Sequence, residues 1–181
     1  MKAILLILAL ILLFIIFIYN RLITLRNAVK NNWARIDTQL QRRYDLIPNL
    51  IETVKGYTAH EKEVLESVTK ARTAFLNADT IAATAEAENM LSGALKSLFA
   101  VSENYPDLKA SQNFLMLQEE LAGTENKISY ARQSYNNAVM DYHVARQKFP
   151  ANLIANLFNF KEAEFFTLKD ETARKPVKVS F

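Results

Sequence analysis

The sequence predicts an all-α protein: an N-terminal transmembrane helix followed by an antiparallel, up-and-down four-helix bundle with long helices. Residues 3–19 form an unbroken apolar run, the 181 residues include only three glycines and four prolines, and apolar residues then recur at steps of three and four. We expect three regions: a transmembrane anchor at 1–20, a bundle domain at 21–148, and a short amphipathic segment with a tail at 149–181.

The apolar run predicts a membrane anchor. Its seventeen residues would span about 26 Å as a helix, close to the ~30 Å hydrocarbon core of a bilayer. A secretory signal peptide is the alternative, but its apolar region usually has about 7–15 residues and ends at a small-x-small cleavage site, whereas this run leads into Asn20 and Arg21. The pattern favours an uncleaved anchor, represented by Ala3, Leu5, Leu12, Phe14, Phe17 and Tyr19.

Charge indicates the side of the membrane and excludes one class of partner. Four basic residues follow the run before the first acid, Asp37, whereas only Lys2 and the α-amine precede it. The positive-inside rule therefore favours a bundle domain in the cytoplasm. The net charge of +3 is too small, and too evenly mixed along the chain, to predict a nucleic-acid partner. Without cysteine, the chain has no disulfide framework and no thiolate metal site.

Turn residues divide the remaining chain. Pro48 should stop or kink the first helix within residues 44–47, because proline disfavours α geometry at the preceding residue and lacks an N–H. Residues 77–80 supply an N-cap before Ile81, Asp107 is expected as the next N-cap, and Pro150 should end the last helix. The four expected helices are 21–44, 48–76, 81–104 and 107–148.

Pro48 leaves two arrangements open. The apolar phase continues through it, so one kinked helix is an alternative to a chain reversal. With a reversal, the last helix would exceed the first by about 18 residues, or roughly 27 Å. Either arrangement leaves apolar helix face uncovered within one chain, which favours self-association into a homo-oligomer.

The segment at 151–160 also has two interpretations. Leu153, Ile154, Leu157 and Phe160 fall together on one helical face. Such a helix could cap the bundle, or it could lie at the membrane interface, to which an even number of antiparallel helices would return it. The alternating residues 176–181 are expected to be a frayed end unless they pair as a strand.

The sequence contains no recognisable catalytic or metal-binding pattern. His60 begins an incomplete HExxH motif, because Val64 stands where the second zinc ligand belongs. Neither His60 nor His143 has the preceding glutamate of a di-iron motif. We therefore expect no enzyme activity, no cofactor and no metal; a carboxylate site near Glu119, Glu125 and His60 is the weakest hypothesis.

One interruption in the apolar pattern predicts a polar cluster. Between Leu121 and Ile128 the core position falls on Thr124 or Glu125. An inward Glu125 would need a partner, because an unpaired buried charge is costly. The alternative is that Glu125 edges the core and meets solvent. The residues assigned to this structural network, or to a partner-binding notch, are Arg26, Arg42, Asp45 and Glu125.

Several motifs carry a family resemblance. They are residues 19–22 (YNRL), 33–37 (WARID), 39–50 (QLQRRYDLIPNL), 105–110 (YPDLKA), 117–121 (LQEEL) and 124–128 (TENKI). In this order and spacing, the chain resembles the LemA family over nearly its whole length. The resemblance implies a bacterial single-pass protein of the cell (inner) membrane with a helical bundle and no known enzyme activity. Asn159 stands where relatives often have glycine.

The residues and the resemblance together predict a non-catalytic scaffold anchored in the lipid bilayer. It would self-associate or dock another membrane protein, and the resemblance implies a membrane protease as one such partner, because family members are often encoded near membrane metalloproteases. The alternative is a membrane-organising or membrane-remodelling protein that makes a second contact through residues 151–160. Magnetosome-associated proteins are among the relatives that the resemblance implies.

Overall fold

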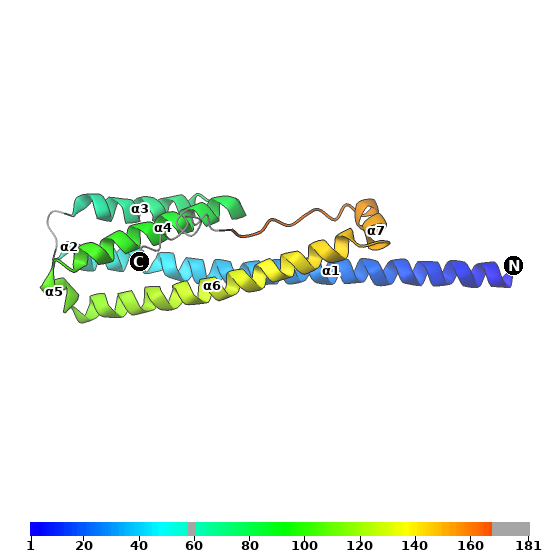
Figure 1. Cartoon of the computed structure of the whole chain (residues 1–181), viewed down its shortest axis with the longest axis horizontal. Helices are drawn as coiled ribbons and strands as arrows, with labels where there is room; N and C mark the ends of the chain where they lie inside the picture. The colour runs from blue at the N-terminus through cyan, green and yellow to red at the C-terminus, as the bar shows by residue number, and fades with distance from the viewer. Residues whose placement is uncertain (58–60, 168–181) are drawn as a thin grey trace, which may run out of the picture. The chain divides into compact units, whose positions relative to one another are not determined.

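Every regular element in the described part of the chain is a helix. A computed structural model describes residues 1–57 and 61–167 (Figure 1). His60 and the tail at 176–181 lie outside the described residues. The all-α prediction is confirmed, and the elements are α1 (Lys2–Asp45), α2 (Ile47–Lys55), α3 (Lys62–Leu76), α4 (Ile81–Ser102), α5 (Pro106–Lys109), α6 (Gln112–Gln147) and α7 (Ala151–Leu157).

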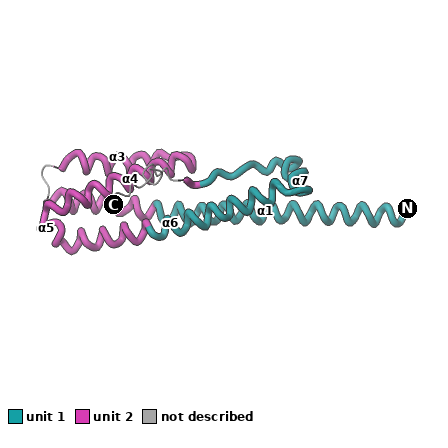
Figure 2. The backbone as a smooth tube through the Cα atoms, in the orientation of Figure 1, with its two compact units in different colours: residues 1–40, 126–165 teal, residues 41–125, 166–181 magenta. Residues whose placement is uncertain are grey.

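The chain divides into two compact units (Figure 2). Among the described residues, unit 1 contains 1–40 and 126–165, and unit 2 contains 41–57, 61–125, 166 and 167. Helices α1 and α6 each contribute one part to each unit.

Unit 2 is an up-and-down bundle of four helical segments. The segment formed by the end of α1 and α2 runs one way, α3 returns, α4 reverses again, and the first part of α6 runs back (Figure 1). Apolar side chains from all four segments are buried, which provides the driving force for their packing. They include Leu50, Val54, Val68, Leu91, Leu95, Leu98, Phe114 and Leu121.

The chain does not reverse at Pro48. Only Leu46 separates α1 from α2, its backbone is helical (φ −75°, ψ −21°), and the Leu50 N–H still donates to the Leu46 carbonyl at 3.1 Å. Proline is tolerated in the first turn of a helix, where its missing N–H needs no partner. The predicted place of the break is therefore confirmed, and its outcome is the kinked-helix alternative.

The reversal comes after α2, so the single helix predicted at 48–76 is wrong. It consists of α2, which ends at Lys55 with Gly56 as its C-cap, and α3, which begins at Lys62. The apolar phase could not show this end, because helical spacing resumes in α3. The anchor and the helix expected at 21–44 are likewise one element, since α1 runs from Lys2 to Asp45.

In unit 1, the second part of α6 is paired with α1 and is not left uncovered. The second part of α6 lies beside residues of α1 and runs in the opposite direction (Figures 1 and 2). Trp33 and Tyr135 meet edge to face, with ring centroids 5.5 Å apart. The overhang of roughly 27 Å that a reversal at Pro48 would have produced does not arise, so it gives no support to self-association. Buried residues of this pairing include Leu22, Val29, Ile36, Ile128, Tyr135, Val139 and Tyr142.

Two of the three predicted boundaries hold. Thr80 caps α4, because its hydroxyl accepts a hydrogen bond from the Ala83 N–H at 3.1 Å. Helix α6 ends at Gln147, just before Pro150. Asp107 as an N-cap is wrong: Pro106 already occupies the first turn of α5, because Tyr105 before it takes a non-helical conformation. The long helix then begins only at Gln112.

Candidate functional site

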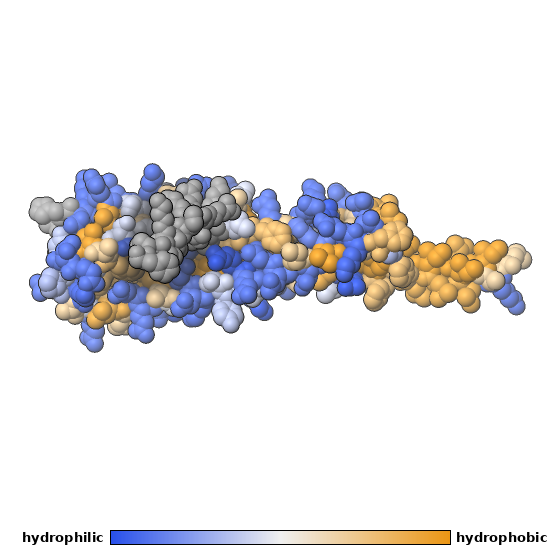
Figure 3. All heavy atoms as spheres, viewed as in Figure 1, coloured by the Kyte–Doolittle hydropathy of each residue, from blue (hydrophilic) through white to orange (hydrophobic). Residues whose placement is uncertain are grey.

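The N-terminal part of α1 presents a continuous apolar surface (Figure 3). Leu5, Leu12, Phe14 and Phe17 each expose half or more of their area, and Ala3 is exposed as well. Helix Lys2–Lys55, counted across the kink, is long and apolar enough to cross a membrane. Such a surface is unfavourable in water and matches the lipid interior.

Only two of the four residues predicted to form the apolar face at 151–160 are exposed. Leu153 and Leu157 are 60% and 77% exposed, whereas Ile154 and Phe160 are buried. Phe149 and Phe158 are also exposed, by 80% and 50%. We call Phe149, Leu153, Leu157 and Phe158 the α7 apolar surface.

Asn159 sets the direction in which the chain leaves α7. Its φ of 53° is left-handed, a conformation that glycine and asparagine adopt most readily. The Phe160 N–H donates to the Ala155 carbonyl at 2.9 Å, and the Asn159 N–H donates to the Asn156 carbonyl at 3.2 Å. This pair of bonds is a Schellman motif, in which Asn159 takes the left-handed position that glycine most often occupies.

The end of α7 packs against the polar end of the anchor within unit 1. The ring of Tyr19 lies 4.9 Å from that of Phe158 and 5.6 Å from that of Phe160, both edge to face. The Arg26 guanidinium lies 5.1 Å from the centroid of the Phe160 ring. Arg26 is therefore a cation–π partner of Phe160 and is placed apart from the predicted polar network.

Side chains of α6 hold the extended segment 160–164. Tyr142 donates to the Lys161 carbonyl at 2.8 Å, Tyr135 donates to the Glu164 carbonyl at 2.6 Å, and His143 Nε2 accepts from the Ala163 N–H at 3.2 Å. Arg146 donates to the Phe160 carbonyl and to the Glu162 carboxylate, and this bond lowers the pKa of Glu162. These bonds satisfy backbone groups that have no helical partner, and we call them the C-terminal ladder.

Unit 2 contains a buried charge network centred on Arg43. Its guanidinium pairs with Glu88 of α4 and Glu125 of α6 and lies 3.4 Å from the Ser92 hydroxyl. The Arg43 and Glu88 side chains are 5% and 1% exposed, whereas Glu125 is 45% exposed. The network therefore joins three helices. Thr124 fills the adjacent core position and is 1% exposed.

Burial dominates the titration of Glu88. It raises the pKa of this carboxyl from 4.5 to about 7, the Arg43 charge opposes the rise, and the Glu125 charge adds to it. The neighbouring Tyr44 phenol also has a raised pKa, first because it is buried and second because it faces Glu88. Tyr44 stacks on Phe75 with ring centroids 3.9 Å apart. Near neutral pH the Glu88 carboxyl is thus poised between its two forms.

Sequence reasoning assigned Glu125 to a polar network, but it chose Arg42 instead of the adjacent Arg43 and did not identify Glu88. The signal was a heptad position: Arg43 lies seven residues from the buried Ile36 and Leu50, and Glu88 lies seven from the buried Leu95. A charged residue in a buried heptad position needs a partner on a facing helix. Following the same stripe across Pro48 would have found Arg43.

Two other predicted members lie elsewhere. Arg42 forms an exposed pair with Glu120 at 2.8 Å, in which both side chains are about half exposed. Asp45 is exposed, and within residues 1–57 and 61–167 no ion pair includes it. Neither residue joins the Arg43 network directly.

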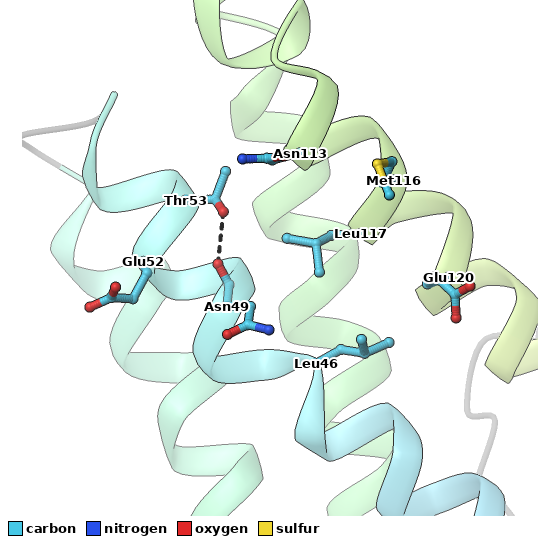
Figure 4. Close-up of a pocket in the computed structure, with 8 residues that line it drawn as sticks. All are labelled: Leu46, Asn49, Glu52, Thr53, Asn113, Met116, Leu117 and Glu120. Carbon is cyan, nitrogen blue, oxygen red and sulfur yellow. Dashed lines mark hydrogen bonds between the residues drawn. The ribbon is translucent and has the colours of Figure 1, made fainter.

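A groove lies between α2 and the start of α6 in unit 2 (Figure 4). It has a volume of about 500 Å³, and its lining mixes apolar Leu46, Met116 and Leu117 with the acids Glu52 and Glu120. The Met116 side chain is 62% exposed. Among the described residues, no group of three or more His, Cys, Asp or Glu side chains is arranged to hold a metal ion. The groove therefore offers a surface for docking and shows no arrangement for metal chemistry.

These features define a class: a helical-bundle protein whose first helix is long and apolar enough to anchor it in a membrane. The sequence matches the LemA family model over residues 32–181, and the chain belongs to the LemA family.

Curated relatives are similar over most of the chain. Magnetosome protein MamQ 2 of Paramagnetospirillum magneticum is 24% identical over 177 residues, covering 83% of this chain and 65% of that protein. Protein LemA of Metamycoplasma hominis is 26% identical over 152 residues, covering 81% of this chain and 68% of that protein. Magnetosome protein MamQ of Magnetospirillum gryphiswaldense is 22% identical, with 82% and 64% covered. The chain thus spans just under two thirds of the length of the MamQ relatives.

Proposed function

We propose that this protein is a non-catalytic scaffold that anchors a helical bundle to the bilayer and there pairs with a second copy or docks another membrane protein. The observation that carries the proposal is the continuity of α1. Within unit 1, the exposed apolar residues up to Phe17 and the buried residues from Leu22 to Leu40 belong to one helix, which is uninterrupted from Lys2 to Asp45. A continuous helix keeps the packed residues of unit 1 next to the anchor, whereas a flexible linker would not.

Features of unit 2 support a docking role. The groove of Figure 4 combines exposed Met116 with two acids, a lining that suits a helix carrying apolar and basic residues. The buried Arg43 network ties three helices together, and we propose that it fixes their register, as buried polar groups do in some bundles. We place the bundle in the cytoplasm, as the positive-inside rule favours, and in the inner membrane of a bacterial cell. A membrane protease remains one proposed partner.

Site-specific photocrosslinking tests the docking role. A photoreactive amino acid at Met116, in the full chain in native membranes, should give one dominant adduct, either with a second copy or with one membrane protein. The matched control is Tyr130, which is 79% exposed on α6 but lies in unit 1, outside the groove. Equal adduct yields at both positions, together with a strictly monomeric particle in gentle detergent, would reject the scaffold.

A second candidate function is membrane organisation through the α7 apolar surface. Leu157 and Phe149 are more than three-quarters exposed, and α7 ends on Tyr19, the residue expected at the bilayer interface. The contact would use Phe149, Leu153, Leu157 and Phe158, because the predicted Ile154 and Phe160 are buried.

A single cysteine can report this contact, since the natural chain has none. An environment-sensitive dye on Leu157→Cys, in the full chain in liposomes, should be blue-shifted and quenched by brominated lipid. The same dye on Asn156→Cys, an exposed polar neighbour, should be less affected. Equal emission and quenching at the two positions would exclude the second membrane contact.

A further inference from the structure

A cavity of about 560 Å³ in unit 1 lies where the anchor gives way to polar residues. Phe14, Phe17 and Ile18 of the apolar run line one part, and Arg21 follows on the same face of α1. The facing wall comes from α6 and from the start of α7. This volume is typical of ligand pockets.

The pairing register of α1 and α6 gives the depth of Arg21 and Lys148 relative to the membrane. Trp33 and Tyr135 contact each other in antiparallel helices. Arg21 lies twelve residues before Trp33, and Lys148 thirteen after Tyr135, so at 1.5 Å per residue their levels differ by about 1.5 Å. Both side chains line the cavity. Arg21 lies about 28 Å along α1 from Lys2, which places both cations at the headgroup level when the apolar run spans the bilayer.

The charged residues of the lining determine which ligands the cavity can bind. Asp141 also lines it, and among the described residues no ion pair includes Arg21, Lys148 or Asp141. By the same register Asp141 lies about 10 Å further from the membrane than Lys148. The lining therefore has two cations at the lipid phosphate level, an apolar floor toward the bilayer, and an excess of one positive charge.

We propose that this cavity binds one anionic phospholipid, with its phosphate on Arg21 and Lys148 and an acyl chain along Phe14 and Phe17. Asp141 accepts a hydrogen bond from a headgroup hydroxyl, which suits a glycerol headgroup. The proposal rests on the membrane anchoring of the proposed function and adds a defined lipid to it. The occupant is a lipid and no soluble phosphate, because the apolar floor is continuous with the membrane-spanning surface.

The test uses the full chain, reconstituted with equal amounts of phosphatidylglycerol and phosphatidylcholine and then examined by native mass spectrometry in mild detergent. Wild type should retain one phosphatidylglycerol in preference to phosphatidylcholine. Each cation at an anionic surface contributes about fivefold, so Arg21→Gln/Lys148→Gln should lower the apparent affinity about 30-fold. The matched control Lys30→Gln/Lys161→Gln removes the same charge from exposed positions outside the cavity and should change it less than twofold.

A second variant and a competitor complete the design. Ala145→Leu narrows the cavity without a change of charge and should also reduce lipid retention. Excess glycerol phosphate should leave the bound lipid in place; displacement would show a soluble-phosphate site and overturn the proposal. Equal retention by the cavity variant and its control would overturn it too. Carbonate extraction distinguishes a failure of this inference from a failure of the proposed function. A chain that stays in the membrane but shows no lipid preference refutes only this inference. A chain that washes off refutes the membrane anchoring itself.

Discussion

Replacing Arg43 with methionine should destabilise unit 2 strongly, because it leaves the Glu88 carboxylate without its cation. Both side chains are at most 5% exposed. Breaking a buried ion pair by removing one partner costs about 3–5 kcal/mol. The matched control is Arg42→Met, the adjacent residue, whose pair with Glu120 is about half exposed and contributes at most about 1 kcal/mol.

The cost of Arg43→Met should depend on pH. With Arg43 present, the pKa of Glu88 is about 7 against 4.5 unfolded, so burying the carboxyl costs about 1 kcal/mol at pH 5.5 and about 3 kcal/mol at pH 8. Without the cation, the pKa rises further. The cost of burying the carboxyl then increases at pH 8, and it is unchanged at pH 5.5, where the carboxyl is already protonated in the folded wild type. The variant should therefore lose about 1 kcal/mol more at pH 8 than at pH 5.5.

Urea unfolding of the full chain in detergent, followed by circular dichroism, measures both effects. With a slope of about 2 kcal/mol per molar urea, a loss of 3 kcal/mol lowers the midpoint by about 1.5 M. Arg43→Met/Glu88→Leu should recover most of the loss, because an apolar pair can replace a buried ion pair. A midpoint shift no larger than that of Arg42→Met, or one independent of pH, would refute the assignment of this network.

Three further predictions concern other parts of the chain. Wild type should lose about 3 kcal/mol of stability as pH rises from 4.5 through 7, because the folded state favours protonated Glu88; in urea titrations Glu88→Gln should flatten this slope, and an equally steep one would contradict the raised pKa. Thr80→Ala removes the N-cap of α4 and should cost about 1 kcal/mol, or about 2–4 °C in Tm by calorimetry; an unchanged Tm would show that the cap contributes nothing. Tyr142→Phe removes a bond to the Lys161 carbonyl and should speed tryptic cleavage there, whereas Tyr130→Phe, at an exposed position, should not; equal rates would count against the C-terminal ladder.

The C-terminal ladder gives α7 a defined place in unit 1. Tyr135, Tyr142 and Arg146 fix the segment 160–164, and Phe160 lies between the Tyr19 ring and the Arg26 guanidinium. The α7 apolar surface is thereby held beside the polar end of the anchor. Because this surface is fixed relative to α1 within unit 1, the orientation of α1 in the bilayer decides whether the surface reaches lipid. Both proposed membrane contacts, the anchor and the α7 apolar surface, therefore depend on α1.

The residues by themselves determined the helical fold, the apolar character of the first helix, the N-cap at Thr80 and the helix end just before Pro150. These depend on local properties: unbroken apolar character, spacing of three and four, and side chains that bond their own backbone. The resemblance to the LemA family also followed from the sequence, and the family match over residues 32–181 confirms it.

Only the tertiary structure decided where the chain turns and which charges meet. The local chemistry of Pro48 is compatible with a kink and with a chain reversal. Packing decides between them, and in the structure α2 continues in line with α1. Which buried charges meet depends on helices far apart in the chain: Arg43 meets Glu88 only because α4 returns beside α1. Burial of Phe160 and exposure of Leu157 likewise depend on where the C-terminal ladder holds the chain. Local sequence fixes which groups need partners, and long-range packing fixes which partners they find.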